Sequence, residues 1–209
     1  MSNTILIPRN AKQIFINGPS GKLDSLLLSP SNGEAIGAAV IFHPDPKGGG
    51  TYTNKVVQTM AKVLCQKGYL CICPNLRGVG LSEGVYDYGV GEIEDGQAVL
   101  NYLKVEYPDL PIVIGGFSFG AYIASKVAQN TQYKKLILIG PAAVNYNISI
   151  SDINKTIAIH GENDEVVAPD AIKQWSRDND LPVIWFPNTG HFFHGKLVVL
   201  QNLLNSFMF

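Results

Sequence analysis

Short apolar runs alternate with amphipathic segments of helical length along most of this 209-residue chain. Such runs are typical of strands that are buried on both faces of a sheet. Parallel strands need a crossover connection, and the intervening segments have the length and periodicity of helices. The alternation therefore predicts an α/β fold in which helices cover both faces of a mostly parallel sheet.

The expected strands occupy residues 38–42, 70–73, 112–116, 135–139, 156–160 and 183–186. The expected helices occupy residues 55–66, 92–105, 119–129, 170–177 and 196–207. Two alternating stretches, residues 13–17 and 22–28, flank a Gly-Pro-Ser-Gly turn and predict an N-terminal hairpin. No repeat or linker interrupts this series, so residues 1–209 are expected to form a single domain.

The last expected helix carries an apolar stripe made of Leu197, Leu200, Leu204 and Met208. A stripe of this spacing is expected to face the core, and a dimer seam is the alternative. The sequence therefore leaves monomer and homodimer open.

The nearly neutral net charge limits the classes of molecule that this chain is expected to bind. The chain has 16 Lys and Arg against 17 Asp and Glu, which gives a formal net charge of -1 and no basic surface for a nucleic acid. No run approaches the roughly 18 apolar residues of a membrane span, and the first ten residues lack a secretory-signal pattern. The three cysteines, Cys65, Cys71 and Cys73, cannot all pair, and Cys71 and Cys73 suit buried free thiols in a reducing compartment. A cytoplasmic protein without a membrane partner is therefore expected.

The most specific motif is Gly-x-Ser-x-Gly, formed by Gly116, Ser118 and Gly120. It follows the expected strand 112–116 and opens an expected helix, which is the strand-turn-helix context of a nucleophile elbow. Glycine on either side removes side chains that would clash with the backbone of a sharp turn. The alternative is an ordinary strand-helix turn that uses glycine for close packing.

A serine hydroxyl needs a base to act as a nucleophile at neutral pH, and the base needs an orienting group. Asp164 follows the expected strand 156–160, and His191 follows the expected strand 183–186. Ser118, Asp164 and His191 thus each lie just past the carboxyl end of a different parallel strand, where open α/β sheets place their sites. The order predicts a Ser-His-Asp triad with His191 as the base.

Other side chains compete for these roles. Glu162 and Glu165 are alternatives to Asp164, and His194 is an alternative to His191. His43 and His160 end strands and are expected to support the site through hydrogen bonds rather than to catalyse. No His, Cys or carboxylate spacing matches a metal site, and neither a metal nor a cofactor is expected.

An acyl-transfer site also needs donors for the oxyanion. The N–H of Phe119, directly after the nucleophile, is one candidate. The loop after strand 38–42 is expected to supply the other, and since Pro44 and Pro46 lack an N–H, Asp45 is preferred over Lys47. The three glycines of this loop resemble a phosphate cradle, but the Lys-Ser/Thr of a P-loop is absent.

Together these motifs resemble the α/β-hydrolase superfamily, and more narrowly its small bacterial serine hydrolases related to the dienelactone hydrolases. The resemblance is carried by residues 43–50, 77–84, 116–120, 160–167 and 190–191. It implies a sheet of about eight strands, Ser118, Asp164 and His191 as the triad, and a structural role for residues 77–84. True dienelactone hydrolases use a cysteine where Ser118 stands, and residues 140–155 are too few for a helical lid.

The sequence therefore predicts a lidless serine hydrolase that cleaves small, short-chain carboxylic esters. A thioesterase or peptidase with the same triad is the first alternative, because one triad serves every acyl transfer. A non-catalytic binding module with this fold is the second alternative, although it would not need a strained serine.

Overall fold

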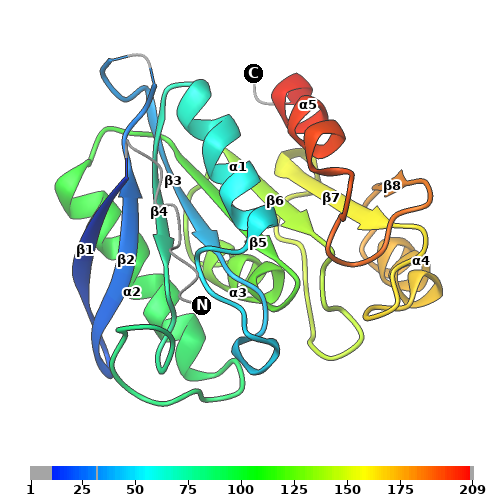
Figure 1. The fold of residues 1–209 in the computed structure, drawn as a ribbon, viewed down its shortest axis with the longest axis horizontal. Helices are drawn as coiled ribbons and strands as arrows, with labels where there is room; N and C mark the ends of the chain where they lie inside the picture. Colours follow the sequence, from blue (N-terminus) through cyan, green and yellow to red (C-terminus); the bar gives the residue numbers. More distant parts are fainter. Residues whose placement is uncertain (1–10, 32, 208–209) are drawn as a thin grey trace, which may run out of the picture.

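The computed structural model describes residues 11–31 and 33–207, and it contains an eight-stranded sheet in the order β1-β2-β4-β3-β5-β6-β7-β8 (Figure 1). The strands are β1 (Ala11–Gly18), β2 (Gly21–Leu28), β3 (Gly37–Phe42), β4 (Tyr69–Pro74), β5 (Ile112–Phe117), β6 (Lys135–Ile139), β7 (Thr156–Gly161) and β8 (Val183–Phe186). Strands β1 and β2 form the hairpin, β2 pairs antiparallel with β4, and the remaining pairs are parallel. This architecture confirms the predicted α/β fold with its mostly parallel sheet.

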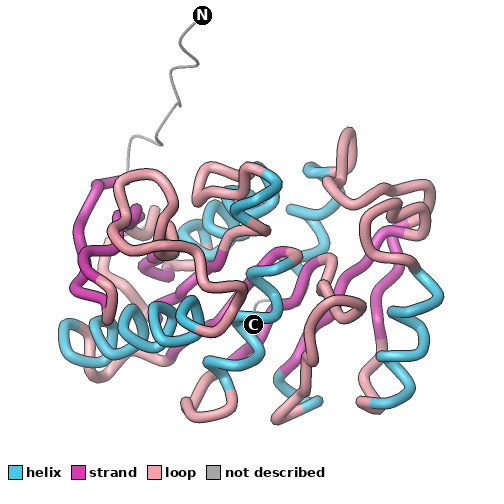
Figure 2. The backbone as a smooth tube through the Cα atoms, turned by 90° about the horizontal axis from the view of Figure 1, so that it is seen from below, coloured by secondary structure: helices cyan, strands magenta, loops and turns pink. Residues whose placement is uncertain are grey.

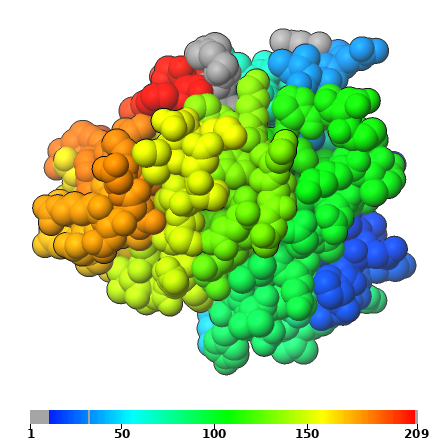
Figure 3. Space-filling model, turned by 180° about the vertical axis from the view of Figure 1, so that it is seen from behind, coloured from blue at the N-terminus to red at the C-terminus, as the bar shows by residue number. Residues whose placement is uncertain are grey.

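In the described residues, five helices cover the sheet: α1 (Lys55–Gln66), α2 (Gly91–Glu106), α3 (Phe119–Ala128), α4 (Pro169–Asp178) and α5 (Leu197–Phe207). Helices α1 and α5 pack on one face, and α2, α3 and α4 pack on the other, so the strands form the middle layer in Figure 2. Figure 3 shows the second face from behind, with α2 in green and α4 in orange. Strands buried on both faces explain why the sequence shows continuous apolar runs there.

The predicted elements differ from the observed ones mainly at their ends. The hairpin pairs from Ala11 with Leu28 to Gly18 with Gly21, so both strands are longer than their alternating cores. Helix α4 begins one residue earlier than expected, at Pro169, because proline is well tolerated at the start of a helix.

The last helix buries Leu200 and Leu204 against α1, as a core-facing stripe requires. Leu197 packs against the same cluster and is partly buried. Met208, which completes the predicted stripe, and the ten residues tested for a secretory signal lie outside the described residues.

Cys71 and Cys73 are buried and unpaired, as predicted, and Cys65 is buried and unpaired as well. Cys65 lies on α1, and Cys71 and Cys73 lie on β4, so all three belong to the core between α1 and the sheet. None of the helices in residues 11–31 and 33–207 is long and apolar enough to cross a membrane.

The loops that follow β3, β5, β7 and β8 lie along the carboxyl edge of the parallel strands, which runs from the bottom centre to the right of Figure 1. The connection between β6 and β7 contains only the short 3-10 turn η2 (Ile153–Lys155) and no helical lid, as predicted. The fold therefore brings the candidate residues to one uncovered edge of the sheet.

Candidate active site

Ser118 occupies a strained turn between β5 and α3. Its φ of 56° and ψ of -117° lie where residues other than glycine are rare. The flanking positions have no room for a side chain. A Cβ on Gly116 would collide with the carbonyl of Gly120, and a Cβ on Gly120 would collide with the carbonyl of Phe42. The chain therefore holds a nucleophile-elbow geometry at Ser118, at a cost in backbone strain that is typical of functional sites.

His191 connects Ser118 to Asp164. Its Nε2 lies 2.9 Å from Ser118 Oγ, and its Nδ1 lies 2.7 Å from Asp164 Oδ2. A carboxylate only accepts hydrogen bonds, so Nδ1 carries the ring proton and Nε2 is free to accept the hydroxyl proton of Ser118. All three side chains are buried, which protects these hydrogen bonds from competition with water.

The carboxylate of Asp164 is held on both oxygens. Its Oδ1 accepts the N–H groups of Val166 at 2.9 Å and Val167 at 2.7 Å, while Oδ2 faces His191. Burial by itself would raise the pKa of Asp164, but the hydrogen bonds from His191 and from the two backbone N–H groups outweigh it and lower that pKa. Asp164 therefore stays ionised at neutral pH.

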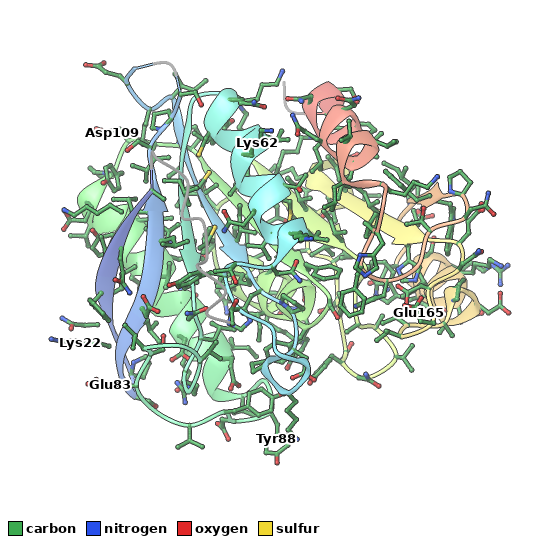
Figure 4. All side chains as sticks on the ribbon, in the orientation of Figure 1. Lys22, Lys62, Glu83, Tyr88, Asp109 and Glu165 are labelled. Atoms are coloured by element: carbon green, nitrogen blue, oxygen red, sulfur yellow. The ribbon has the colours of Figure 1, made fainter. Side chains whose placement is uncertain are left out.

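The competing residues lie elsewhere. The side chain of Glu162 is exposed, and so is His194, whose ring lies tilted beside that of Phe192 with centroids 5.8 Å apart. Glu165 comes closer, because its Oε2 accepts the backbone N–H of His191 at 3.3 Å, but it does not contact the imidazole ring. Figure 4 labels Glu165 among the loops at the carboxyl edge. The structure thus brings together the three predicted residues, and in the described residues no rival side chain hydrogen-bonds to the side chain of Ser118, Asp164 or His191.

The loop after β3 lies against the N-terminus of α3. A Cβ on Gly120 would touch the carbonyl groups of both Phe42 and His43, which defines this close approach. In the described part of the chain the N–H groups of Asp45 and Phe119 donate no hydrogen bond, so both remain available to a ligand.

The alternative donor in this loop, the N–H of Lys47, is already used. It donates to the Asp45 carboxylate at 2.9 Å and caps the 3-10 turn η1 (Pro46–Gly48). The Lys47 N–H therefore already has a partner within the protein, whereas the Asp45 N–H has none in the described residues. The same hydrogen bond occupies an oxygen of the Asp45 carboxylate.

His43 fixes the start of this loop. Its Nε2 accepts the N–H of Leu76 at 3.0 Å, so its Nδ1 carries the proton and donates to the carbonyl of Pro44 at 2.7 Å. Burial lowers the pKa of His43 to about 4, and the ring is neutral at neutral pH. This is the supporting role that the sequence predicted for His43.

Sequence reasoning missed an aromatic cluster next to Ser118, formed by Tyr86, Tyr88, Phe119, Tyr122 and Tyr146. The ring of Phe119 contacts Tyr86 with centroids 5.9 Å apart and Tyr146 with centroids 5.3 Å apart. At the edge of the cluster, labelled in Figure 4, Tyr88 is exposed beneath the Lys47 ammonium, which lies 4.1 Å from the ring centroid. These rings come from three separate segments, and no spacing in the sequence predicts their meeting.

The loop that carries Tyr86 and Tyr88 is anchored at both ends. Arg77 makes a bidentate ion pair with the fully buried Asp95 at 2.8 and 2.9 Å. The buried carboxylate of Glu92 accepts the N–H groups of Asp87 and Gly89, each at 2.7 Å. These contacts agree with the structural role that was expected for residues 77–84. Residues 11–31 and 33–207 contain no group of three His, Cys, Asp or Glu side chains that could hold a metal ion.

Comparison with known proteins places this site in a family. Residues 34–159, which run from just before β3 into β7 and include Ser118, match the model of the family called serine aminopeptidase, S33. A protein of Rickettsia prowazekii is 33% identical over 210 residues, which cover 94% of this chain and 88% of that protein. The chain belongs to the S33 family.

Solved structures agree with this assignment. A lidless α/β serine hydrolase from Xanthomonas campestris shares 32% identity, with 96% of this chain and 94% of that chain covered and a TM-score of 0.89. An α/β serine hydrolase homologue from Coxiella burnetii shares 36% identity over 97% of this chain and 100% of that chain, also with a TM-score of 0.89. The protein is therefore a serine hydrolase of the α/β-hydrolase superfamily, and its fold lacks a lid.

Proposed function

We propose that this S33 family member hydrolyses small, short-chain carboxylic esters through a Ser-His-Asp triad. The observation that carries the proposal is the continuous hydrogen-bonded path from Ser118 Oγ through His191 to Asp164, with distances of 2.9 and 2.7 Å. Such a path supplies a nucleophile, a base for its proton and an acid that fixes the tautomer of the base.

In the first half of the reaction, Ser118 Oγ attacks the ester carbonyl carbon while His191 Nε2 takes the hydroxyl proton. The tetrahedral intermediate then collapses, and the imidazolium returns that proton to the departing alcohol. In the second half, water attacks the acyl-enzyme, His191 accepts a proton from the water, and Ser118 leaves with that proton. Asp164 stays ionised throughout and stabilises the imidazolium.

The N–H groups of Phe119 and Asp45 are proposed to bind the oxyanion. Both are free of protein partners in the described residues, and the Phe119 N–H also lies at the positive end of the α3 dipole. A single donor of this kind is worth about 10²- to 10³-fold in kcat. The Asp45 side chain is engaged by the Lys47 N–H, so Asp45 contributes to the proposed hole through its backbone.

The absence of a lid between β6 and β7 supports small substrates. A lid supplies apolar surface for long acyl chains and excludes water during the reaction. Here the substrate contacts come from the strand-end loops and from the aromatic cluster, which suits a short acyl group better than a long one.

The first experiment tests the nucleophile. A fluorophosphonate probe is expected to label the native protein, but not Ser118→Ala or His191→Ala. Ser125→Ala is the matched control, because Ser125 is a buried serine on the same helix whose hydroxyl bonds only to the carbonyl of Tyr122. Equal labelling of the native protein and Ser118→Ala would exclude the proposed nucleophile, and no labelling of the native protein would favour a binding module.

The second experiment tests the substrate class. Nitrophenyl esters from acetate to decanoate are compared with thioesters of the same acyl groups and with aminoacyl nitroanilides. The highest kcat/KM is expected for the acetate and butyrate esters. A clear preference for decanoate would refute the short-chain proposal, and a preference for a thioester or an aminoacyl amide would move the assignment to a thioesterase or peptidase.

A further inference from the structure

A second histidine contacts the proposed catalytic acid. His160 lies near the end of β7 and is fully buried. Its Nε2 is 3.0 Å from the carbonyl oxygen of Val167 and 3.4 Å from Oδ2 of Asp164. The same Oδ2 accepts the Nδ1–H of His191 at 2.7 Å, so two imidazole rings face one carboxylate oxygen.

The contacts of His160 determine which ring nitrogen carries the proton. Both neighbours of Nε2 are acceptors, a carbonyl oxygen and a carboxylate oxygen, so Nε2 must be the protonated nitrogen. In the neutral ring Nδ1 then has no proton, and it is a buried atom without a hydrogen-bond partner in the described part of the chain. Burial lowers the pKa of His160, which favours this neutral form at neutral pH.

We propose that His160 is a positioning residue that orients the Asp164 carboxylate toward His191. The N–H groups of Val166 and Val167 hold Oδ1 of Asp164. The Nε2–H of His160 donates to the carbonyl of Val167, and Nε2 lies 3.4 Å from Oδ2. The hydrogen bond to Val167 fixes the segment that holds the carboxylate, and the partial positive charge of the nearby N–H favours the orientation in which Oδ2 faces His191. This inference rests on the proposed role of Asp164.

The fold also fixes the ring of His160. Strands β7 and β8 pair in parallel, and their register sets His160 beside Trp185. The two rings meet edge to face, with centroids 5.6 Å apart and an interplanar angle of 83°. The direction of the Nε2–H is therefore set before any substrate binds, which is the preorganisation that a catalytic acid-base pair requires.

The Nε2–H of His160, whose nitrogen lies 3.4 Å from Oδ2, also changes how strongly Asp164 attracts the proton on His191. The partial positive charge of an N–H near a carboxylate offsets part of its negative charge, so removing this N–H strengthens the attraction for the imidazolium. The other charged groups around the pair are Glu165, which accepts the His191 backbone N–H, and Lys173, which lies 5.9 Å from the Trp185 ring. Neither changes when His160 is replaced.

Two variants separate positioning from core packing. His160→Gln keeps an N–H at the same number of bonds from the backbone as Nε2, whereas His160→Leu fills the space without a donor. We expect kcat of His160→Leu to fall about tenfold with KM unchanged, and the acid limb of kcat/KM to move to higher pH by about half a unit. His160→Gln should stay within about threefold of the native kcat and keep the native pH profile.

Equal losses in the two variants, or a native kcat and pH profile in His160→Leu, would overturn the positioning role. If His160→Leu does not fold, His160→Asn serves as the donor-free variant, because its shorter amide does not reach Oδ2. The proton resonance of the His191 Nδ1–H provides a readout without turnover. It should shift in the donor-free variant and not in His160→Gln, even if the native protein cleaves no ester, and an unchanged resonance in both would overturn the inference.

Discussion

Replacing Asp164 by asparagine is expected to reverse the tautomer of His191. The N–H groups of Val166 and Val167 need an acceptor, so the amide oxygen of the new side chain takes the place of Oδ1. The amide NH₂ group then occupies the place of Oδ2, 2.7 Å from Nδ1 of His191. Because an NH₂ group only donates, Nδ1 must become an acceptor and the ring proton moves to Nε2.

With its proton on Nε2, His191 cannot accept the proton of Ser118. The loss of a triad carboxylate in this way costs about 10⁴-fold in kcat, which corresponds to about 5.4 kcal/mol of transition-state stabilisation at ~1.36 kcal/mol per factor of ten. The assay is hydrolysis of 4-nitrophenyl acetate at neutral pH, together with the rate of fluorophosphonate labelling. Both rates should fall together, because the loss affects the attack by Ser118 and not the binding of one substrate.

The matched control is Glu165→Gln, in which the amide oxygen can still accept the backbone N–H of His191. We expect kcat of this variant to fall less than about threefold, since replacing an exposed charged side chain with a neutral one of the same shape changes little. A loss of less than tenfold in Asp164→Asn, or a loss in Glu165→Gln that matches it, would refute the tautomer argument and move the orienting acid to Glu165.

Two further predictions concern stability. His43 titrates at about 4 in the folded protein, below its ordinary value of 6.5, so its contribution is complete above pH 6.5 and is lost as the pH falls from 6.5 to 4. The free energy of unfolding should fall by about 3 kcal/mol over this pH range. A Tm-against-pH curve of His43→Gln that is as steep as that of the native protein would contradict this prediction. Arg77→Met leaves the fully buried Asp95 without its cation and should cost about 3 to 5 kcal/mol in denaturant unfolding. Glu94→Gln, which alters only the long 3.4 Å contact of the same guanidinium with an exposed side chain, should cost less than about 1 kcal/mol.

The interior of each element could be predicted from the sequence, because burial on both faces leaves a continuous apolar run such as residues 112–114 in β5. The ends of the elements were less certain, since hairpin pairing extends through positions such as Gly18 and Gly21 that carry no apolar signal. The positions of Ser118, Asp164 and His191 were also accessible, because chain order and strand ends determine where they fall. Their catalytic roles remain proposals.

Contacts between separate loops could not be predicted in this way. The aromatic cluster joins residues from the segment before α2, the start of α3 and the loop after β6, and each tyrosine is unremarkable in its own segment. The Lys47 N–H is occupied only because the Asp45 side chain adopts a rotamer in which its carboxylate accepts that N–H. The spacing of residues in the sequence does not predict this rotamer. The shared Oδ2 of Asp164 depends on the register of β7 with β8.

The three buried histidines share one property that matters for a site without a lid. Each has a ring nitrogen whose partner can only donate or only accept: His43 receives the N–H of Leu76, His160 faces a carbonyl and a carboxylate, and His191 faces a carboxylate. Their tautomers are therefore fixed by the protein and not by the solvent. An open site cannot strengthen its interactions by closing and expelling water, so its donors and acceptors must be correctly set in the free protein. The fixed tautomers supply that preorganisation.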